Sequence, residues 1–247
     1  NEYVAASNYL QALKTEPGHE EALKKLQQVA QSAYKQKLKL AKGYEEQNNL
    51  NDALNEYQQL QRLIESYRKH GVLTFVPIDT DQAIQRVKTG AADRHYAQAE
   101  KLFSQNAYER AIDEYRSALD YSASFKDADQ KIAESYYRMA SRSVERDQYR
   151  SAANTYLQAT DESAGYKDAS RRAATLYYEL GDYFLSNGQC RKAHQDFSKT
   201  RSIDAQYRET DQKLSAAMEC GTTKIAFMRF ENPTGRNLAG MALGDVI

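Results

Sequence analysis

Small and aromatic residues recur along this chain at a fixed spacing. The small positions are Ala111, Ala152 and Ala193, at 41-residue steps, and the aromatic positions four residues later are Tyr115, Tyr156 and Phe197. Residues four apart share one face of an α-helix, so the small residue admits a neighbouring helix while the ring fills the remaining space. The pattern therefore predicts an amphipathic helix that returns in each repeat.

A second motif has the same 41-residue step and predicts another helix in each repeat. Its copies are Phe125-Lys126-Asp127-Ala128, Tyr166-Lys167-Asp168-Ala169 and Tyr207-Arg208-Glu209-Thr210. Asp127 and Asp168 are placed to act as N-caps, with carboxylates that accept hydrogen bonds from first-turn amides. A helix of about 18 residues then runs to a polar break, which is Gln105-Asn106, Arg146-Asp147 or Asn187-Gly188. Each repeat is predicted to be a hairpin of two helices.

Earlier copies of the pattern have longer spacers. Ala53 and Tyr57 match the second helix 58 residues before Ala111, and Ala5 and Tyr9 match it another 48 residues back. Five copies of the second helix are thus expected, the first in an incomplete repeat. Seven extra residues before Ala53 predict a first helix about two turns longer. The step from Ala53 to Ala111 exceeds the 41-residue period by 17 residues, and these form an insertion at about 68–85.

Composition agrees with an all-α chain. Only three prolines occur among 247 residues, and the mean hydropathy of −0.83 suits many thin helix–helix contacts better than one thick core. A single hairpin cannot bury its own apolar stripe, but stacked hairpins can. We therefore expect an α-solenoid over residues 1–222.

The pattern resembles the tetratricopeptide repeat. Matching positions are Ala12 and Pro17 in the opening segment, Ala140, Ala152, Tyr156 and Ala159 in one repeat, and Gly181, Ala193 and Phe197 in the next. The period of 41 departs from the usual length of about 34, so the helices should be longer. The resemblance implies a right-handed solenoid that binds other proteins without catalysis or cofactor.

In that family the first helices line a groove, which gives three candidate rows for a protein partner. They are Tyr96, Tyr137 and Tyr178; Glu100, Ser141 and Asp182; and Phe103, Val144 and Leu185. Tyrosine is favoured at protein interfaces. Tyrosine at helical spacing equally fits the core between repeats, and both interpretations stay open.

The insertion offers a second candidate surface for a partner. Its apolar residues are Val72, Leu73, Phe75 and Val76. The segment either folds back over the solenoid or projects as a contact loop for another protein or subunit, since exposed apolar patches usually mark interfaces.

Charge and motifs argue against several other function classes. The 34 basic and 34 acidic residues cancel, so no electrostatic footprint for nucleic acid is expected. The longest mostly apolar run, at 71–78, is far shorter than the roughly 20 residues of a membrane span. No phosphate-binding glycine motif occurs, and His19-Glu20-Glu21 lacks the second histidine of a helical zinc site. We expect no catalytic site and no metal. Cys190 and Cys220 could form a disulfide in an oxidising compartment.

The residue pattern of the last 25 residues differs from that of the repeats. Residues 224–230 read as a strand, 231–235 as a turn and 238–247 as the beginning of a helix. The segment resembles the start of the domain shared by the curli-secretion lipoprotein family and the TolB amino-terminal domain, at Ile225, Ala226, Phe230, Asn232, Thr234 and Gly235. The resemblance implies that 223–247 begins a truncated α/β domain. It also implies the periplasmic side of a bacterial cell envelope, with the cytoplasm as the alternative. Membrane association would be indirect, or through a lipid anchor that has been removed.

These features support three functional hypotheses. The first is a protein-docking scaffold in an envelope assembly or secretion system. The second is a structural subunit that self-associates through the insertion. The third is a regulatory repeat array attached to a domain beyond Ile247.

Overall fold

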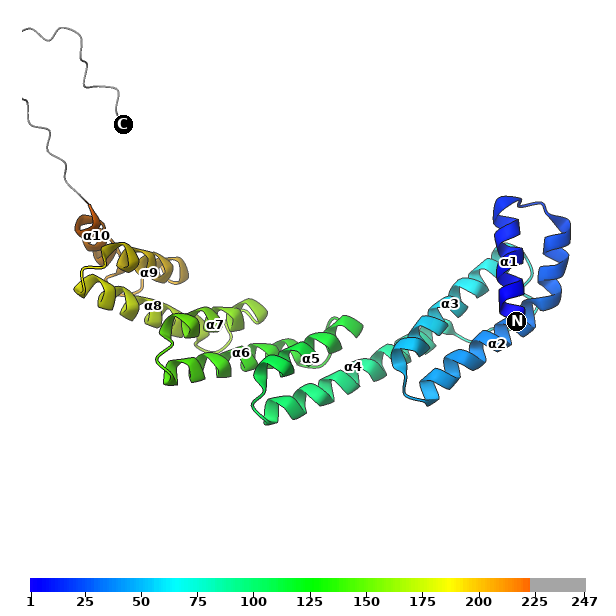
Figure 1. The fold of residues 1–247 in the computed structure, drawn as a ribbon, viewed down its shortest axis with the longest axis horizontal. Helices are drawn as coiled ribbons and strands as arrows, with labels where there is room; N and C mark the ends of the chain where they lie inside the picture. The colour runs from blue at the N-terminus through cyan, green and yellow to red at the C-terminus, as the bar shows by residue number, and fades with distance from the viewer. Residues whose placement is uncertain (223–247) are drawn as a thin grey trace, which may run out of the picture.

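The computed structural model describes residues 1–222, a range that contains ten α-helices and no strand. Their bounds are α1 (Glu2–Thr15), α2 (Glu20–Glu46), α3 (Leu50–Lys69), α4 (Thr80–Ser104), α5 (Tyr108–Tyr121), α6 (Ala128–Glu145), α7 (Tyr149–Glu162), α8 (Ala169–Ser186), α9 (Cys190–Ile203) and α10 (Thr210–Gly221). Figure 1 shows an extended, gently bent array. The all-α prediction is confirmed. The strand, turn and helix predicted for 223–247 lie outside the described residues.

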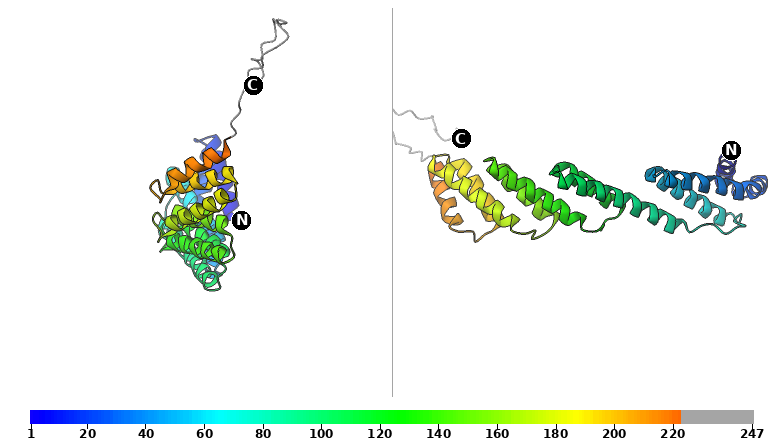
Figure 2. Two further views of the ribbon diagram at one scale, coloured as in Figure 1. Left: turned by 90° about the vertical axis from the view of Figure 1, so that its left-hand side faces the viewer. Right: turned by 90° about the horizontal axis from the view of Figure 1, so that it is seen from below.

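The helices stack as successive antiparallel hairpins. Each helix packs mainly on its neighbours in sequence, and the two further views in Figure 2 show hairpins following one another along a single axis. Helices α5, α7 and α9 lie along one edge of the array, and α4, α6 and α8 lie along the other (Figure 1). With α1 and α3, the second helix occurs five times, as predicted. The chain is an α-solenoid.

The polar breaks between first and second helices are tight turns. Asn48, Asn106, Asp147 and Gly188 adopt the left-handed conformation there, with φ of 57°, 61°, 58° and 69°. Asparagine, aspartate and glycine tolerate this conformation best among the amino acids. The next amide then reaches back to a carbonyl in the last turn, as Ala107 does to Leu102 at 3.0 Å. Each break therefore ends one helix and reverses the chain.

The small and aromatic residues of the second helices form the core of each repeat. Tyr57, Tyr115, Tyr156 and Phe197 are fully buried beside equally buried alanines. The backbone of Gly181 approaches the Phe197 ring so closely that an added Cβ would lie 2.7 Å from it. The residue pattern read from the sequence is thus a packing pattern between adjacent helices.

The long helix α4 belongs to two hydrophobic cores. Its first half places Ala83, Ile84 and Val87 in the core made with α1, α2 and α3. Its second half places Ala99 and Leu102 in the core made with α5 and α6. One continuous helix therefore joins the N-terminal hairpins to the regular repeats.

The extra residues upstream mostly lengthen helices. Helix α2 has 27 residues against 18 in α6 and α8, as the longer spacer predicts. The insertion expected at 68–85 is only partly a loop, because α3 continues to Lys69 and α4 begins at Thr80. Within this segment only residues 70–79 are non-helical, since the flanking residues extend the helices that share the N-terminal core.

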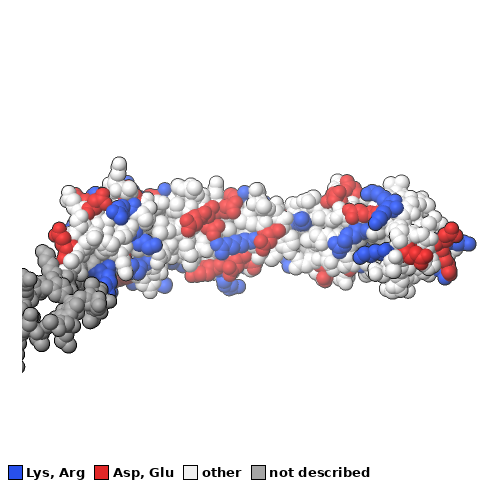
Figure 3. All heavy atoms as spheres, turned by 90° about the horizontal axis from the view of Figure 1, so that it is seen from above, with Lys and Arg blue, Asp and Glu red and all other residues white. Residues whose placement is uncertain are grey.

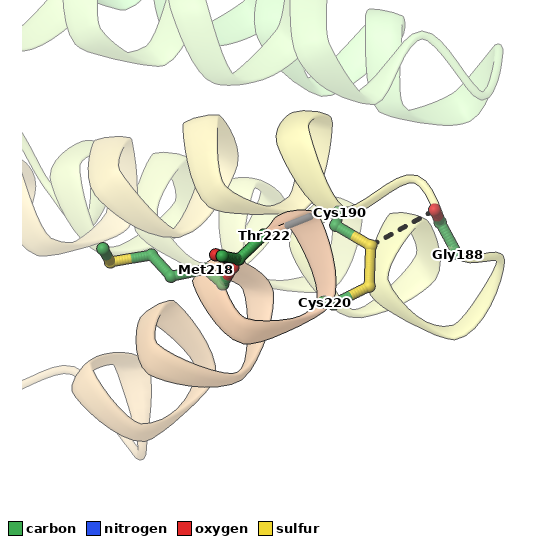
Figure 4. Close-up of a disulfide and its surroundings, with 5 residues drawn as sticks. All are labelled: Gly188, Cys190, Met218, Cys220 and Thr222. Carbon is green, nitrogen blue, oxygen red and sulfur yellow. Dashed lines mark hydrogen bonds between the residues drawn. A yellow bond between two sulfur atoms is a disulfide. The ribbon is translucent and has the colours of Figure 1, made fainter. Parts of the chain in front are cut away.

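A disulfide fastens the last described helix to the array. Cys190 at the start of α9 is bonded to Cys220 at the end of α10, with a Cα–Cα distance of 5.6 Å (Figure 4). On the outer face of α10, Ser215, Met218 and Glu219 are exposed at the positions where α8 buries Ala174, Tyr177 and Tyr178.

We expect removal of the disulfide to loosen α10 and little else, because among the described helices α10 packs mainly on α9 and, to a lesser extent, on α8. The bond joins residues 30 apart, and a loop of that length corresponds to about 3–4 kcal/mol of stabilisation. In the double variant Cys190→Ser/Cys220→Ser, amide hydrogen exchange in α10 should accelerate strongly while exchange in α6 stays unchanged. Ser215→Ala, on the exposed face of α10, is the control and should leave α10 protected. Equal acceleration throughout the array would contradict this local role.

Candidate functional site

A recurring cluster around one tyrosine joins each regular repeat to the next; we call it the tyrosine clasp. In α6, the Tyr137 ring lies edge-on to Tyr156 and Tyr166, with centroid distances of 5.1 and 6.1 Å. Its hydroxyl donates a hydrogen bond to the Asp168 carboxylate at 2.6 Å. The Lys167 ammonium lies 4.9 Å from the ring centroid, within cation–π range. The clasp therefore combines aromatic packing, a hydrogen bond and a cation contact.

The same clasp occurs in the preceding and following repeats. The equivalent residues are Tyr96 with Tyr115, Phe125, Lys126 and Asp127, and Tyr178 with Phe197, Tyr207, Arg208 and Glu209. The cation in each clasp has a positive φ, at 51°, 46° and 44° for Lys126, Lys167 and Arg208. This conformation is unfavourable for a long side chain, so the surrounding contacts must hold it in place. The motif found before each first helix is therefore the sequence signature of the clasp.

The N-cap prediction for Asp127 and Asp168 is wrong in its hydrogen-bond partner. Both residues stand at the N-cap positions of α6 and α8, but neither side chain accepts a hydrogen bond from a first-turn amide. They accept the hydroxyls of Tyr96 and Tyr137 instead. The reason is tertiary: the tyrosine of the preceding repeat lies close enough to compete with the local amides.

The predicted tyrosine row is thus part of the inter-repeat packing. Tyr178 is 4% exposed, while Tyr96 and Tyr137 are half-buried. Burial and the hydrogen bond to Asp168 raise the pKa of Tyr137 to about 12, so its hydroxyl stays protonated and able to donate. A partner could reach the exposed part of Tyr96 and Tyr137, whereas Tyr178 is almost inaccessible. Their role in partner binding remains a prediction.

The two other predicted rows lie beside the clasps. Glu100 forms an ion pair with Lys131 at 2.9 Å, and Asp182 forms one with Lys213 at 2.6 Å. These carboxylates therefore link α4 to α6 and α8 to α10, whereas Ser141 contacts the Tyr156 hydroxyl within its own hairpin at 2.9 Å. The third row of Phe103, Val144 and Leu185 is half-buried along the same face. The three rows lie on one face formed by α4, α6 and α8, where equivalent positions recur every 41 residues.

The insertion folds back over the N-terminal core. Val72 is fully buried, and Leu73 packs against the same core. The Phe75 ring lies 4.7 Å from that of Tyr34, whose hydroxyl accepts a hydrogen bond from the Ile78 amide at 2.9 Å. Of the four apolar residues predicted to contact a partner here, Val76 is 95% exposed and the others face the core.

A cleft that the sequence interpretation missed lies between α1 and α3. It has a volume of about 630 Å³, with Leu10, Leu13 and Leu63 among its lining residues. Lys14, Arg62, Lys69 and His70 also line it. The signal in the sequence is weak, because these residues come from two helices some 50 positions apart and no motif connects them.

The remaining surface offers few signs of other chemistry. Acidic and basic side chains are interspersed on the face shown in Figure 3. Within residues 1–222, no group of three histidine, cysteine or acidic side chains is arranged to hold a metal ion. The described helices also include none with the length and apolar character of a membrane span. The chain matches no protein-family model and no curated protein.

Acid should weaken the clasp between α6 and α8 through Glu134. Burial alone would raise the pKa of the Glu134 carboxyl, but hydrogen bonds from Lys167, Tyr166 and Arg138 lower it from 4.5 to about 2. A lowered pKa contributes stability that is complete above pH 4.5 and is lost as pH falls towards 2. The shift corresponds to about 3 kcal/mol.

Glu134→Gln should therefore lower the free energy of unfolding by about 2–3 kcal/mol at pH 7, and this difference from the wild type should shrink as pH falls from about 5 to 2. Denaturant titrations across this pH range measure it. Glu179→Gln, at an exposed position on α8, is the matched control and should show a small difference that does not depend on pH. A pH-independent loss in Glu134→Gln would rule out the charge as the cause.

Proposed function

We propose that this chain is a non-catalytic docking scaffold of tetratricopeptide type. The observation that carries the proposal is the regular face of the first helices, where equivalent half-exposed positions return at every repeat. Exposed residues Ser104, Glu145 and Ser186 flank this face at 41-residue steps. A partner segment that spans several repeats would meet matching positions at each of them.

Rigidity supports the proposal. The clasps and the ion pairs of Glu100 and Asp182 hold successive first helices in a fixed relation. A preformed surface loses little conformational entropy on binding, so more of the contact energy appears as affinity. Solenoids commonly use such extended surfaces for binding.

The disulfide supports a location in an oxidising compartment. Such bonds persist in secreted and periplasmic proteins and are rare in the cytosol. Together with the resemblance of residues 223–247 to the start of an envelope-protein domain, this favours the periplasmic side of a bacterial envelope. We therefore place the scaffold in an envelope assembly or secretion system.

The alternatives have less support. Self-association through the insertion has little apolar surface available, because Val72, Leu73 and Phe75 face the core. A regulatory array would use the same docking face and would differ from the scaffold only in being attached to a further domain beyond Ile247.

Site-specific photocrosslinking in the native host tests the docking face. A photoreactive residue at Ser104, Glu145 or Ser186 should give one discrete crosslinked product, the same at all three positions. Exposed Asp113, Asn154 and Gln195 on the second helices have the same 41-residue spacing and are the matched controls. We expect no product there. Equal products from both sets, or none from either, would contradict docking on the first helices.

A further inference from the structure

The cleft between α1 and α3 differs from the contacts between α5 and α7 and between α7 and α9. Helices α5 and α7 are joined by an ion pair between Arg116 and Glu162. Helices α7 and α9 are joined by Arg150 and the buried Asp196 at 2.5 Å. Each of these contacts has its own acidic residue. Within residues 1–222 no ion pair joins α1 to α3, and no acidic residue lines the cleft between them.

At one end of the cleft the charges are balanced. The Tyr3 hydroxyl donates to the Gln59 side chain at 3.3 Å, and Gln59 also accepts from the buried Lys37 ammonium at 2.7 Å. Lys37 is in turn neutralised by Glu56 at 2.5 Å. This end therefore leaves no free charge for a ligand.

The rest of the cleft is cationic. Lys14, Arg62 and Lys69 line it with exposed side chains, and none of them forms an ion pair within residues 1–222. Lys14 and Lys69 lie in the last turns of α1 and α3, where the helix dipole favours a cation. Arg62 lies two turns before the end of α3, so the helix dipole does not favour a cation at its position. The helix dipole therefore accounts for the positive charges of Lys14 and Lys69 but not for that of Arg62.

The walls of the cleft also suit a peptide. The half-exposed Leu10 provides the accessible apolar surface above the buried Leu13 and Leu63, and Ser7 and Gln11 line the same space with hydrogen-bonding groups. A peptide needs both, because its side chains bury on apolar surface while its backbone amides need polar partners. A volume of about 630 Å³ is within the usual range of ligand sites.

We propose that this cleft binds an acidic peptide segment of a partner protein. An apolar side chain of the segment lies against Leu10, and its carboxylates pair with Lys14, Arg62 and Lys69. The inference deepens the proposed docking function, on which it rests, and adds a second contact surface, on the second helices at the N-terminal end of the array.

Fluorescence anisotropy on the full chain tests the proposal. The probe is a short labelled peptide in which leucine alternates with glutamate and aspartate, and its counterpart is the same peptide with lysine at the acidic positions. The acidic probe should bind and the basic probe should not. Arg62→Glu/Lys69→Glu should weaken binding at least about 10-fold, because two attractive charge pairs become repulsive.

Lys35→Glu/Lys39→Glu is the matched control, since both residues are exposed on α2 and make the same change in net charge. It should leave the affinity unchanged, and circular dichroism should show that both double variants are folded. Leu10→Gln should weaken binding without altering charge.

Three results would overturn the proposal: no binding of the acidic probe, equal weakening by both charge reversals, or preferential binding of phosphatidylglycerol vesicles that depends on Arg62 and Lys69. The last would assign the site to a lipid headgroup. Crosslinks from Ser104, Glu145 and Ser186 that persist despite a negative peptide result would leave the docking function standing and remove only this cleft from it.

Discussion

The tyrosine clasp is the interaction on which the regular part of this solenoid depends. Each repeat touches only its neighbours, so no central core can compensate for a weak interface between two of them. The clasp places the side chain of a first helix among the second helix of its own hairpin and the loop of the next. Its cation accepts an unfavourable backbone conformation in every copy, at Lys126, Lys167 and Arg208. That conformation turns the loop so that its aromatic, cation and acid all contact the same tyrosine.

The architecture could be predicted from the sequence because the repeats are self-consistent. Fixed spacing of small and aromatic residues revealed the hairpins, and Asn106, Asp147 and Gly188 marked their turns. The inference that failed considered only the local neighbours of a residue. Asp127 stands at the N-cap position of α6, but its carboxylate accepts the hydroxyl of Tyr96, 31 positions earlier, and no first-turn amide. For Tyr178 the sequence left partner binding and core packing both open, and in the structure Tyr207 of the next loop packs against its ring. Both contacts are tertiary.

The N-terminal region keeps less closely to the repeat pattern, and its details are correspondingly harder to predict. His19 stands at the aromatic position of the clasp, but its ring nitrogen accepts the Ala22 amide at 3.3 Å and caps α2. No clasp forms between α1 and α2 in the described structure, and a buried Lys37–Glu56 pair with Gln59 stands in this region instead. The cleft beside α1 arises from this departure, because it lies where the regular contacts are missing.

The continuity of α4 has a consequence for how the molecule comes apart. Its first half is held in one core and its second half in another, with residues about 88–98 between them. Interrupting a helix in its middle removes several backbone hydrogen bonds at once and requires a new, costly nucleus to restart it. Melting of the hairpins on one side of α4 is therefore expected to weaken the hairpins packed directly on its other half. Helix α4 couples two bodies that are otherwise joined by a hydrogen bond between Tyr121 of α5 and Asn51 of α3.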